Sequence, residues 1–158
     1  MEFIKYTIII VLIFLFQSWT AEFFTLGTID PDFCVIVLLY ISIKNGGVIG
    51  TIFGFFIGLF IDLSSGTDQF FGLTPLIYTS TGYFCSFLKG ENEKLNKIYF
   101  TLIWISIILL QFLIFSLIVY QYLLVQDPTQ FIVKWLATSL YTLVFLGILQ
   151  IMVPLHKI

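Results

Sequence analysis

Residues 45–72 decide the fold, and they read NGGVIGTIFGFFIGLFIDLSSGTDQFFG. Glycines recur every four residues at positions 46, 50, 54 and 58, and the same step continues to Asp62 and Gly66. Four residues turn an α-helix by about 400°, so each step moves only ~40° around the helix. The glycine strip (Gly50, Gly54 and Gly58) therefore shares one face with Asp62, among bulky phenylalanines. Such a face is typical of a helix that packs against another helix inside a membrane.

The composition excludes a soluble domain. Of the 158 residues, 59% are hydrophobic and only 10% are charged, whereas soluble domains carry about 25% charge. We therefore predict an integral protein of the lipid bilayer. The net charge of −2 comes without a basic patch, which argues against a nucleic-acid partner. Two isolated cysteines, Cys34 and Cys85, are expected to be buried apolar residues, and no metal-ligand spacing or cofactor motif occurs.

Charged residues divide the chain into six apolar segments, and we predict an all-α bundle in one membrane domain covering residues 1–158. The predicted spans cover residues 4–21, 31–44, 46–63, 70–88, 98–124 and 133–154. The first segment lacks a small-x-small cleavage pattern and is expected to be a retained span. A crossing needs about 20 residues, so the second span is short. The fifth apolar stretch is long, and it is either tilted or ends in an outer segment around Tyr120 to Gln126.

The charges between these spans alternate in sign along the chain. Lysines fall at one set of loops, at positions 5, 44, 89, 94, 97 and 157, and acids fall at the other set, at positions 22, 30, 32, 68 and 127. Under the positive-inside rule, both termini are cytoplasmic. Lys134 is the exception, and we expect its long side chain to reach the outer interface.

Asp62 closes the glycine strip, and a carboxylate near a membrane is costly enough to suggest a role. One interpretation is structural: Asp62 ends the third helix and accepts hydrogen bonds from the backbone of Ser64 or Ser65. A second is contact with a partner or a neighbouring helix, and a third is binding of a cation or proton. At a helix C-terminus the carboxylate opposes the helix dipole, which weakly favours a specific role.

Two further elements have a structural and a functional interpretation. The glycine strip packs either against another helix of this chain or against a partner's membrane helix. The Asp30-Pro31-Asp32 segment either starts the second helix, with Asp30 as N-cap and Pro31 in the first turn, or forms an outer binding site.

The three tryptophans, Trp19, Trp104 and Trp135, are expected to be anchors at the membrane interface. No nucleophile–base pair, paired catalytic carboxylates or phosphate loop is present, so we predict that the protein is not an enzyme.

An ordered set of residues resembles the rod shape-determining protein MreD family. It begins with Pro31-Asp32-Phe33 and Leu38-Leu39-Tyr40, and it continues through the glycine strip to Asp62-Leu63, Ser65-Gly66 and Gly72-Leu73. The motif match covers about residues 31 to 90, and the remainder agrees in hydrophobic pattern.

The resemblance implies a non-catalytic scaffold or regulator of the bacterial cell-elongation complex, which makes peptidoglycan and maintains rod shape in the cytoplasmic (inner) membrane. It implies that the bitopic protein MreC is a partner, and that MreB, RodA and the elongation-type penicillin-binding transpeptidase are direct or indirect partners. It also implies a six-helix fold similar to the substrate-binding components of energy-coupling-factor transporters.

Within that resemblance, we hypothesise that the glycine strip lines a groove for the membrane helix of MreC. Asp62 and the outer loop from Ser64 to Gly72 would then touch the outer segment of the partner. The alternative function is a transporter component that binds a vitamin-like molecule, which requires a cavity with convergent polar groups near the outer face. The candidate polar residues for such a cavity are Asp62, Thr74, Tyr78, Thr79 and Tyr83.

Overall fold

The computed structural model describes residues 29–65, 70–91 and 94–155, together with positions 8, 11, 12, 15 and 19. Six helices lie in the described ranges: α2 (Phe33–Asn45), α3 (Gly47–Ser65), α4 (Leu73–Ser86), α5 (Lys97–Val119), α6 (Gln121–Gln126) and α7 (Pro128–Met152). The predicted all-α fold is confirmed. The predicted first span, 4–21, lies for the most part outside the described residues.

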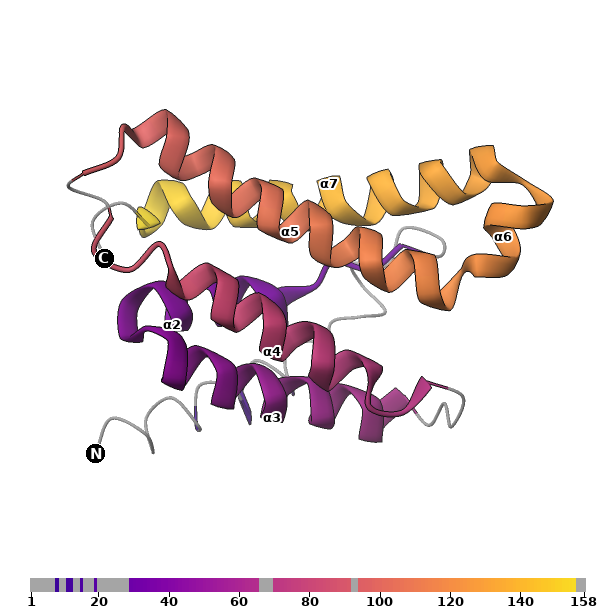
Figure 1. Cartoon of the computed structure of the whole chain (residues 1–158), viewed down its shortest axis with the longest axis horizontal. Helices are drawn as coiled ribbons and strands as arrows, with labels where there is room; N and C mark the ends of the chain where they lie inside the picture. Colours follow the sequence, from indigo (N-terminus) through magenta and orange to yellow (C-terminus); the bar gives the residue numbers. More distant parts are fainter. Residues whose placement is uncertain are drawn as a thin grey trace.

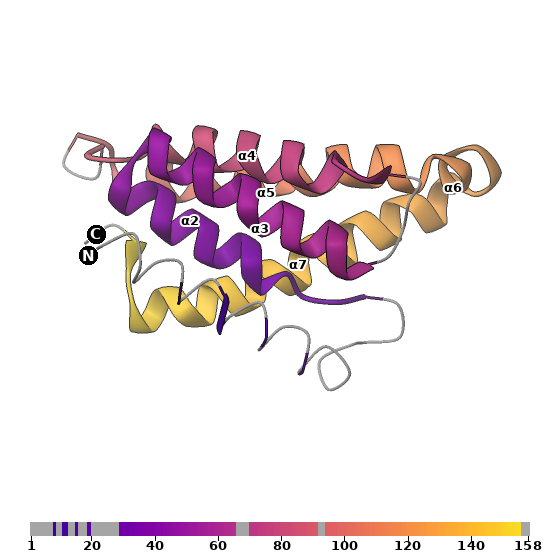
Figure 2. The ribbon, with the colours of Figure 1, turned by 90° about the horizontal axis from the view of Figure 1, so that it is seen from below.

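Four of the helices form two antiparallel pairs, and the 13-residue α2 lies between the pairs. Figure 1 shows α3 beside α4 in one pair and α5 beside α7 in the other. Figure 2 shows α2 lying against α3, on the side of the bundle that faces α7. The two pairs meet where α4 contacts α5, and the short α6 packs at the end of α7.

The short second helix is the centre of the core. Eight of the 13 residues of α2 are buried, because the helix is enclosed by α3, α4 and α7. One apolar cluster joins α2 to α5 and α7 through Ile36, Leu39 and Ile108, and a second joins it to α3 and α4 through Leu38 and Ile57. A helix that is surrounded in this way needs no polar face, which explains its apolar run from Phe33 to Ile41.

Among the described helices, α3, α5 and α7 are long and apolar enough to cross a membrane. Their apolar side chains cover much of the outside of the bundle, as expected of a protein whose solvent is lipid. The long fifth span is divided: α5 ends at Val119, and α6 follows after Tyr120. The long stretch therefore ends in a separate short helix, and the position of α6 outside the membrane stays a prediction. The last helix begins at Pro128, five residues before the predicted boundary, because Asp127 caps it through the backbone N–H groups of Thr129 and Gln130.

Two loops that were assigned to the same membrane side lie together at one end of the bundle (Figure 1). The Lys89 ammonium donates a hydrogen bond to the backbone carbonyl of Asn45, 2.8 Å away, and so ties the α4–α5 loop to the α2–α3 turn. In the same loop, Lys94 pairs with Glu91 at 2.8 Å. At the opposite end, the Lys134 ammonium lies 4.0 Å from the centre of the Tyr120 ring, a cation–π contact.

Trp104 was expected at the membrane interface, and this prediction is wrong. Its side chain is only 3% exposed and belongs to the core cluster around α2. Seven residues separate Trp104 from Gln111, so both lie on the same inward face of α5. Trp135 is partly buried, and its indole nitrogen donates to the carbonyl of Leu109 at 3.3 Å. Only Trp19 is widely exposed among the three.

Candidate functional site

The glycine strip packs against α4 of the same chain. A methyl group added at Gly54 or Gly58 would lie less than 3.0 Å from the backbone of Tyr78 or Pro75. At Gly50 it would lie 2.6 Å from the Ser42 hydroxyl and 2.8 Å from the carbonyl of Gly82. No side chain fits at these positions, because the two backbones touch directly. The hypothetical groove for a partner's helix is therefore occupied by α4, and the helix-packing alternative describes the strip.

The other half of this contact, which we call the α3–α4 seam, lies on α4 and was not predicted. Gly82 of α4 meets Gly50 so closely that an added methyl would clash with the Gly50 backbone. Gly82 stands alone among larger residues, so no spacing signal marks it. The seam is thus a mutual approach of small residues, the arrangement by which helices associate in lipid.

Asp62 is buried and acts within the chain, at the end of the seam. Its carboxylate accepts a hydrogen bond from the backbone N–H of Gly72 at 2.6 Å, and Gly72 caps the start of α4. The predicted partners, the Ser64 and Ser65 amides, are not the ones used. Ser65 instead donates its hydroxyl to the carbonyl of Asp62 at 3.1 Å. Asp62 therefore closes the loop between α3 and α4.

The structure describes only part of this loop. Gly72 has φ +95°, a left-handed conformation that favours glycine, so its place in the motif has a backbone cause. Gly66 lies outside the described residues, as does Asp68.

Asp32 joins three helices, a role that was not predicted. One oxygen accepts from the backbone N–H of Val35 at 3.0 Å and caps α2. The other accepts the hydroxyl hydrogen of Tyr78, from α4. The backbone N–H of Asp32 donates to the Thr142 hydroxyl of α7 at 3.1 Å. The predicted N-cap was Asp30; the structure gives this role to Asp32, two residues later.

These contacts place Asp32 inside the bundle, beside the middle of α7. Thr142 lies near the middle of α7, so the start of α2 lies halfway along a helix long enough to span the membrane. Figure 1 shows the indigo segment before α2 entering the bundle between the helix pairs. An extended backbone at such depth is tolerated only where protein or a cavity surrounds it. Asp32 was grouped with the acids of the outer loops, and the side of the membrane on which Asp32 lies stays a prediction.

A small cavity lies beside this segment. It has a volume of about 200 Å³, and it is lined by Asp30, Pro31 and Asp32 together with residues of α5 and α7, among them Ser116 and Thr138. Pro31 is buried and Asp30 is exposed. Pockets for small molecules usually have about 300–1,000 Å³, so the cavity is smaller than a vitamin-like ligand requires.

The polar residues proposed for a ligand cavity do not converge. Tyr78 bonds to Asp32, Asp62 bonds to Gly72, and Thr79 donates to the carbonyl of Pro75 in its own helix at 2.6 Å. Tyr83 is exposed and packs against Phe84 and Phe87. Within the described ranges, no group of three or more side chains that could hold a metal ion is present.

Comparisons with known proteins agree with the motif. A family model described as rod shape-determining protein MreD matches residues 1–156, essentially the whole chain. No curated protein matches, and no solved structure matches. The similarity to transporter substrate-binding components therefore stays a prediction. The family match spans far more than the 31–90 motif region, and it shows that this chain belongs to the MreD family of rod shape-determining proteins.

Proposed function

We propose that this protein is a non-catalytic membrane scaffold that regulates the bacterial cell-elongation complex by binding MreC. The observation that carries this proposal is the match of residues 1–156 to a shape-determining family. Family membership implies a role in rod shape determination. Binding of MreC, and through it or directly of MreB, RodA and the elongation-type penicillin-binding transpeptidase, is the finer step that we add.

The fold is suited to a holding function. The described polar groups of the core are largely committed to ties within the chain: Asp32 joins α2, α4 and α7, and Asp62 closes the α3–α4 loop. Direct backbone contact along the α3–α4 seam gives a rigid pair. A rigid bundle with an apolar outer surface presents fixed faces to other membrane helices, which is what a scaffold requires.

We place the protein in the bacterial cytoplasmic membrane with both termini in the cytoplasm. The tie between Lys89 and Asn45 supports this orientation, because it gathers the lysine-bearing loops of α2–α3 and α4–α5 at one end. The last turn of α3, which carries Asp62, and the junction of α6 and α7 at Asp127 lie at the other end (Figure 1). The positive-inside rule then assigns the lysine-rich end to the cytoplasm.

The test is co-purification from native membranes with a tag on this chain, together with depletion of the chain in growing rod-shaped cells. We expect MreC and cell-wall synthases in the purified complex, and we expect depleted cells to become round. Recovery of an ATPase module or a vitamin-sized ligand, with rod shape retained, would replace the scaffold by the transporter alternative.

A further inference from the structure

The face of α4 that is turned away from α3 does not close against its neighbour. Between α4 and α5 lies a cavity of about 490 Å³, which we call the α4–α5 groove. It runs from Leu76 and Ile114 at one end to Phe84 and Leu102 at the other. The twelve helical steps from Leu102 to Ile114 make it about 18 Å long. Leu76 and Leu102 are more than half exposed, so the groove is open at the surface that faces lipid.

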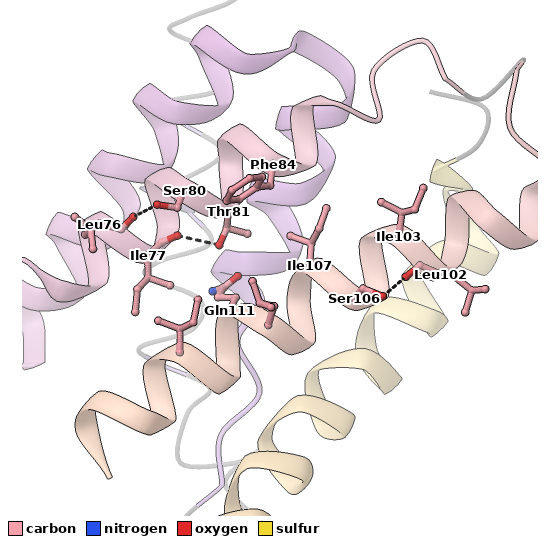
Figure 3. A pocket seen from close by; sticks show the side chains of 12 residues that line it. Leu76, Ile77, Ser80, Thr81, Phe84, Leu102, Ile103, Ser106, Ile107 and Gln111 are labelled. Atoms are coloured by element: carbon pink, nitrogen blue, oxygen red, sulfur yellow. Dashed lines mark hydrogen bonds between the residues drawn. The ribbon is translucent and has the colours of Figure 1, made fainter. Parts of the chain in front are cut away.

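One polar side chain in the groove has no partner. Gln111 lines the groove and is 4% exposed, and its amide oxygen makes no hydrogen bond within the described part of the chain. Figure 3 shows Gln111 projecting from α5 toward α4. In hydrocarbon, an unpaired carbonyl costs several kcal/mol. The two ends of a carboxamide interchange by rotation about its last bond, so the oxygen reaches the groove without backbone movement.

The hydroxyl groups around Gln111 do not satisfy it. Ser80, Thr81 and Ser106 donate to carbonyls of their own helices at 2.8 to 2.9 Å, as the dashed lines in Figure 3 indicate. The missing partner is therefore a hydrogen-bond donor from outside the described bundle. A lipid acyl chain has no donor, so it would fill the groove and leave the amide unpaired.

We propose that the α4–α5 groove seats the single transmembrane helix of a partner protein, which presents a serine, threonine, asparagine or glutamine side chain to Gln111. The antiparallel helices α4 and α5 leave a groove between them in which a third helix can pack. The small side chains of Ser80 and Ser106 let the backbone of that helix approach. This proposal rests on the scaffold function, for which it names the docking face. It also moves that face from the glycine strip, which α4 covers, to the opposite side of α4.

The experiment is photo-crosslinking in cells that produce full-length MreC. p-Benzoylphenylalanine replaces Leu110, which lines the groove and is 52% exposed. The matched control replaces Val144 of α7, which is 57% exposed and lies outside the groove. We expect the first variant, and not the second, to crosslink to the membrane helix of MreC.

Each other outcome overturns the proposal. Crosslinking from position 144 alone, or no crosslink although MreC co-purifies, would reject the groove and keep the scaffold. A lipid adduct at position 110, or a crosslink to residues 1–28 of the same chain, would name a different occupant. Absence of MreC from the purified complex would reject the scaffold function itself.

A second variant tests the hydrogen bond. Gln111→Leu removes an unpaired amide, so it is expected to fold, and it is expected to weaken MreC binding by about 3-fold to 20-fold, the range for hydrogen bonds between membrane helices. Gln121→Leu makes the same change at an exposed position of α6 and is expected to leave binding unchanged. Equal binding by Gln111→Leu and the unmodified protein would exclude Gln111 as the contact.

Discussion

The two long faces of α4 make opposite contacts with their neighbours. Toward α3, Gly82, Tyr78 and Pro75 of α4 meet three glycines, and the backbones touch. Toward α5, the neighbouring side chains are mostly leucines and isoleucines, with Ser106 and Gln111 among them, and a cavity of about 490 Å³ remains. The helix itself carries small residues on both faces, with Gly82 on one and Ser80 on the other. The difference therefore comes from what each neighbour supplies.

The comparison separates an internal contact from a candidate external one. In lipid, apolar side chains gain nothing from leaving the solvent, so helices are held by close packing and hydrogen bonds. The α3–α4 seam has both, since it is tightly packed and closed at one end by Asp62. The α4–α5 groove has neither, and it keeps the unpaired Gln111. The seam is thus complete within the chain, whereas the groove is not.

The largest effect is expected from breaking the seam. Gly54→Ala places a methyl group less than 3.0 Å from the Tyr78 backbone, and overpacking against rigid atoms costs about 3 kcal/mol or more. We expect a strongly lowered Tm in detergent and little protein in membranes. Gly147→Ala is the control, because an added methyl there meets nothing within 4 Å. Equal stability of the two variants would contradict the seam.

The second largest loss of stability is expected from substituting Asp32, which connects α4 to α2 and α7. Asp32→Ala removes the acceptor of Tyr78 and the cap of α2, and the loss of hydrogen bonds to a carboxylate costs about 2 kcal/mol. In Asp32→Asn the remaining oxygen accepts from the Val35 N–H, and the amide NH2 donates to the Tyr78 hydroxyl oxygen in place of the lost acceptor, so this variant should lose less than half as much. Thermal unfolding of both variants checks this order, and an equal loss would show that the charge itself is required.

A smaller effect on folding, with a large effect on assembly, is expected from filling the groove. Ser106→Trp adds bulk at an exposed groove position, so its stability should change by no more than about 0.5 kcal/mol. Its co-purification with MreC should fall sharply. A matched Leu140→Trp change on exposed α7 should bind normally. Loss of binding in both variants would place the docking face elsewhere.

The smallest effect is expected at Asp127, which is partly exposed and belongs to neither face. The Thr129 hydroxyl and the Gln130 amide donate to its carboxylate and hold its pKa below the ordinary value of 3.8. A lowered pKa means that the cap contributes stability above pH 3.8 and loses it as the pH falls through the folded value. NMR titration of the carboxyl should show this low midpoint. A midpoint above 3.8 would contradict the capping contact.

The sequence by itself determined the class of the protein and the geometry of one helix face. The scarcity of charge requires lipid as solvent, and a four-residue glycine period puts the strip on one side of a helix wherever that helix lies. Both properties are local or compositional, so they do not depend on the rest of the fold. The ordered motif around Asp62 also sufficed to identify the family, which the whole-chain match confirms.

Only the tertiary structure decided which helix covers the strip and where Asp32 lies. Gly82 has no partner in its own sequence neighbourhood, so nothing local marks it as the residue that meets Gly50. Span prediction assumes that each segment begins at the membrane surface, whereas α2 begins halfway along α7, at the level of Thr142. The surrounding helices supply the hydrogen bonds that make such depth possible. Those bonds join residues 46 and 110 positions apart, and a separation of this kind is fixed by packing and not by sequence period.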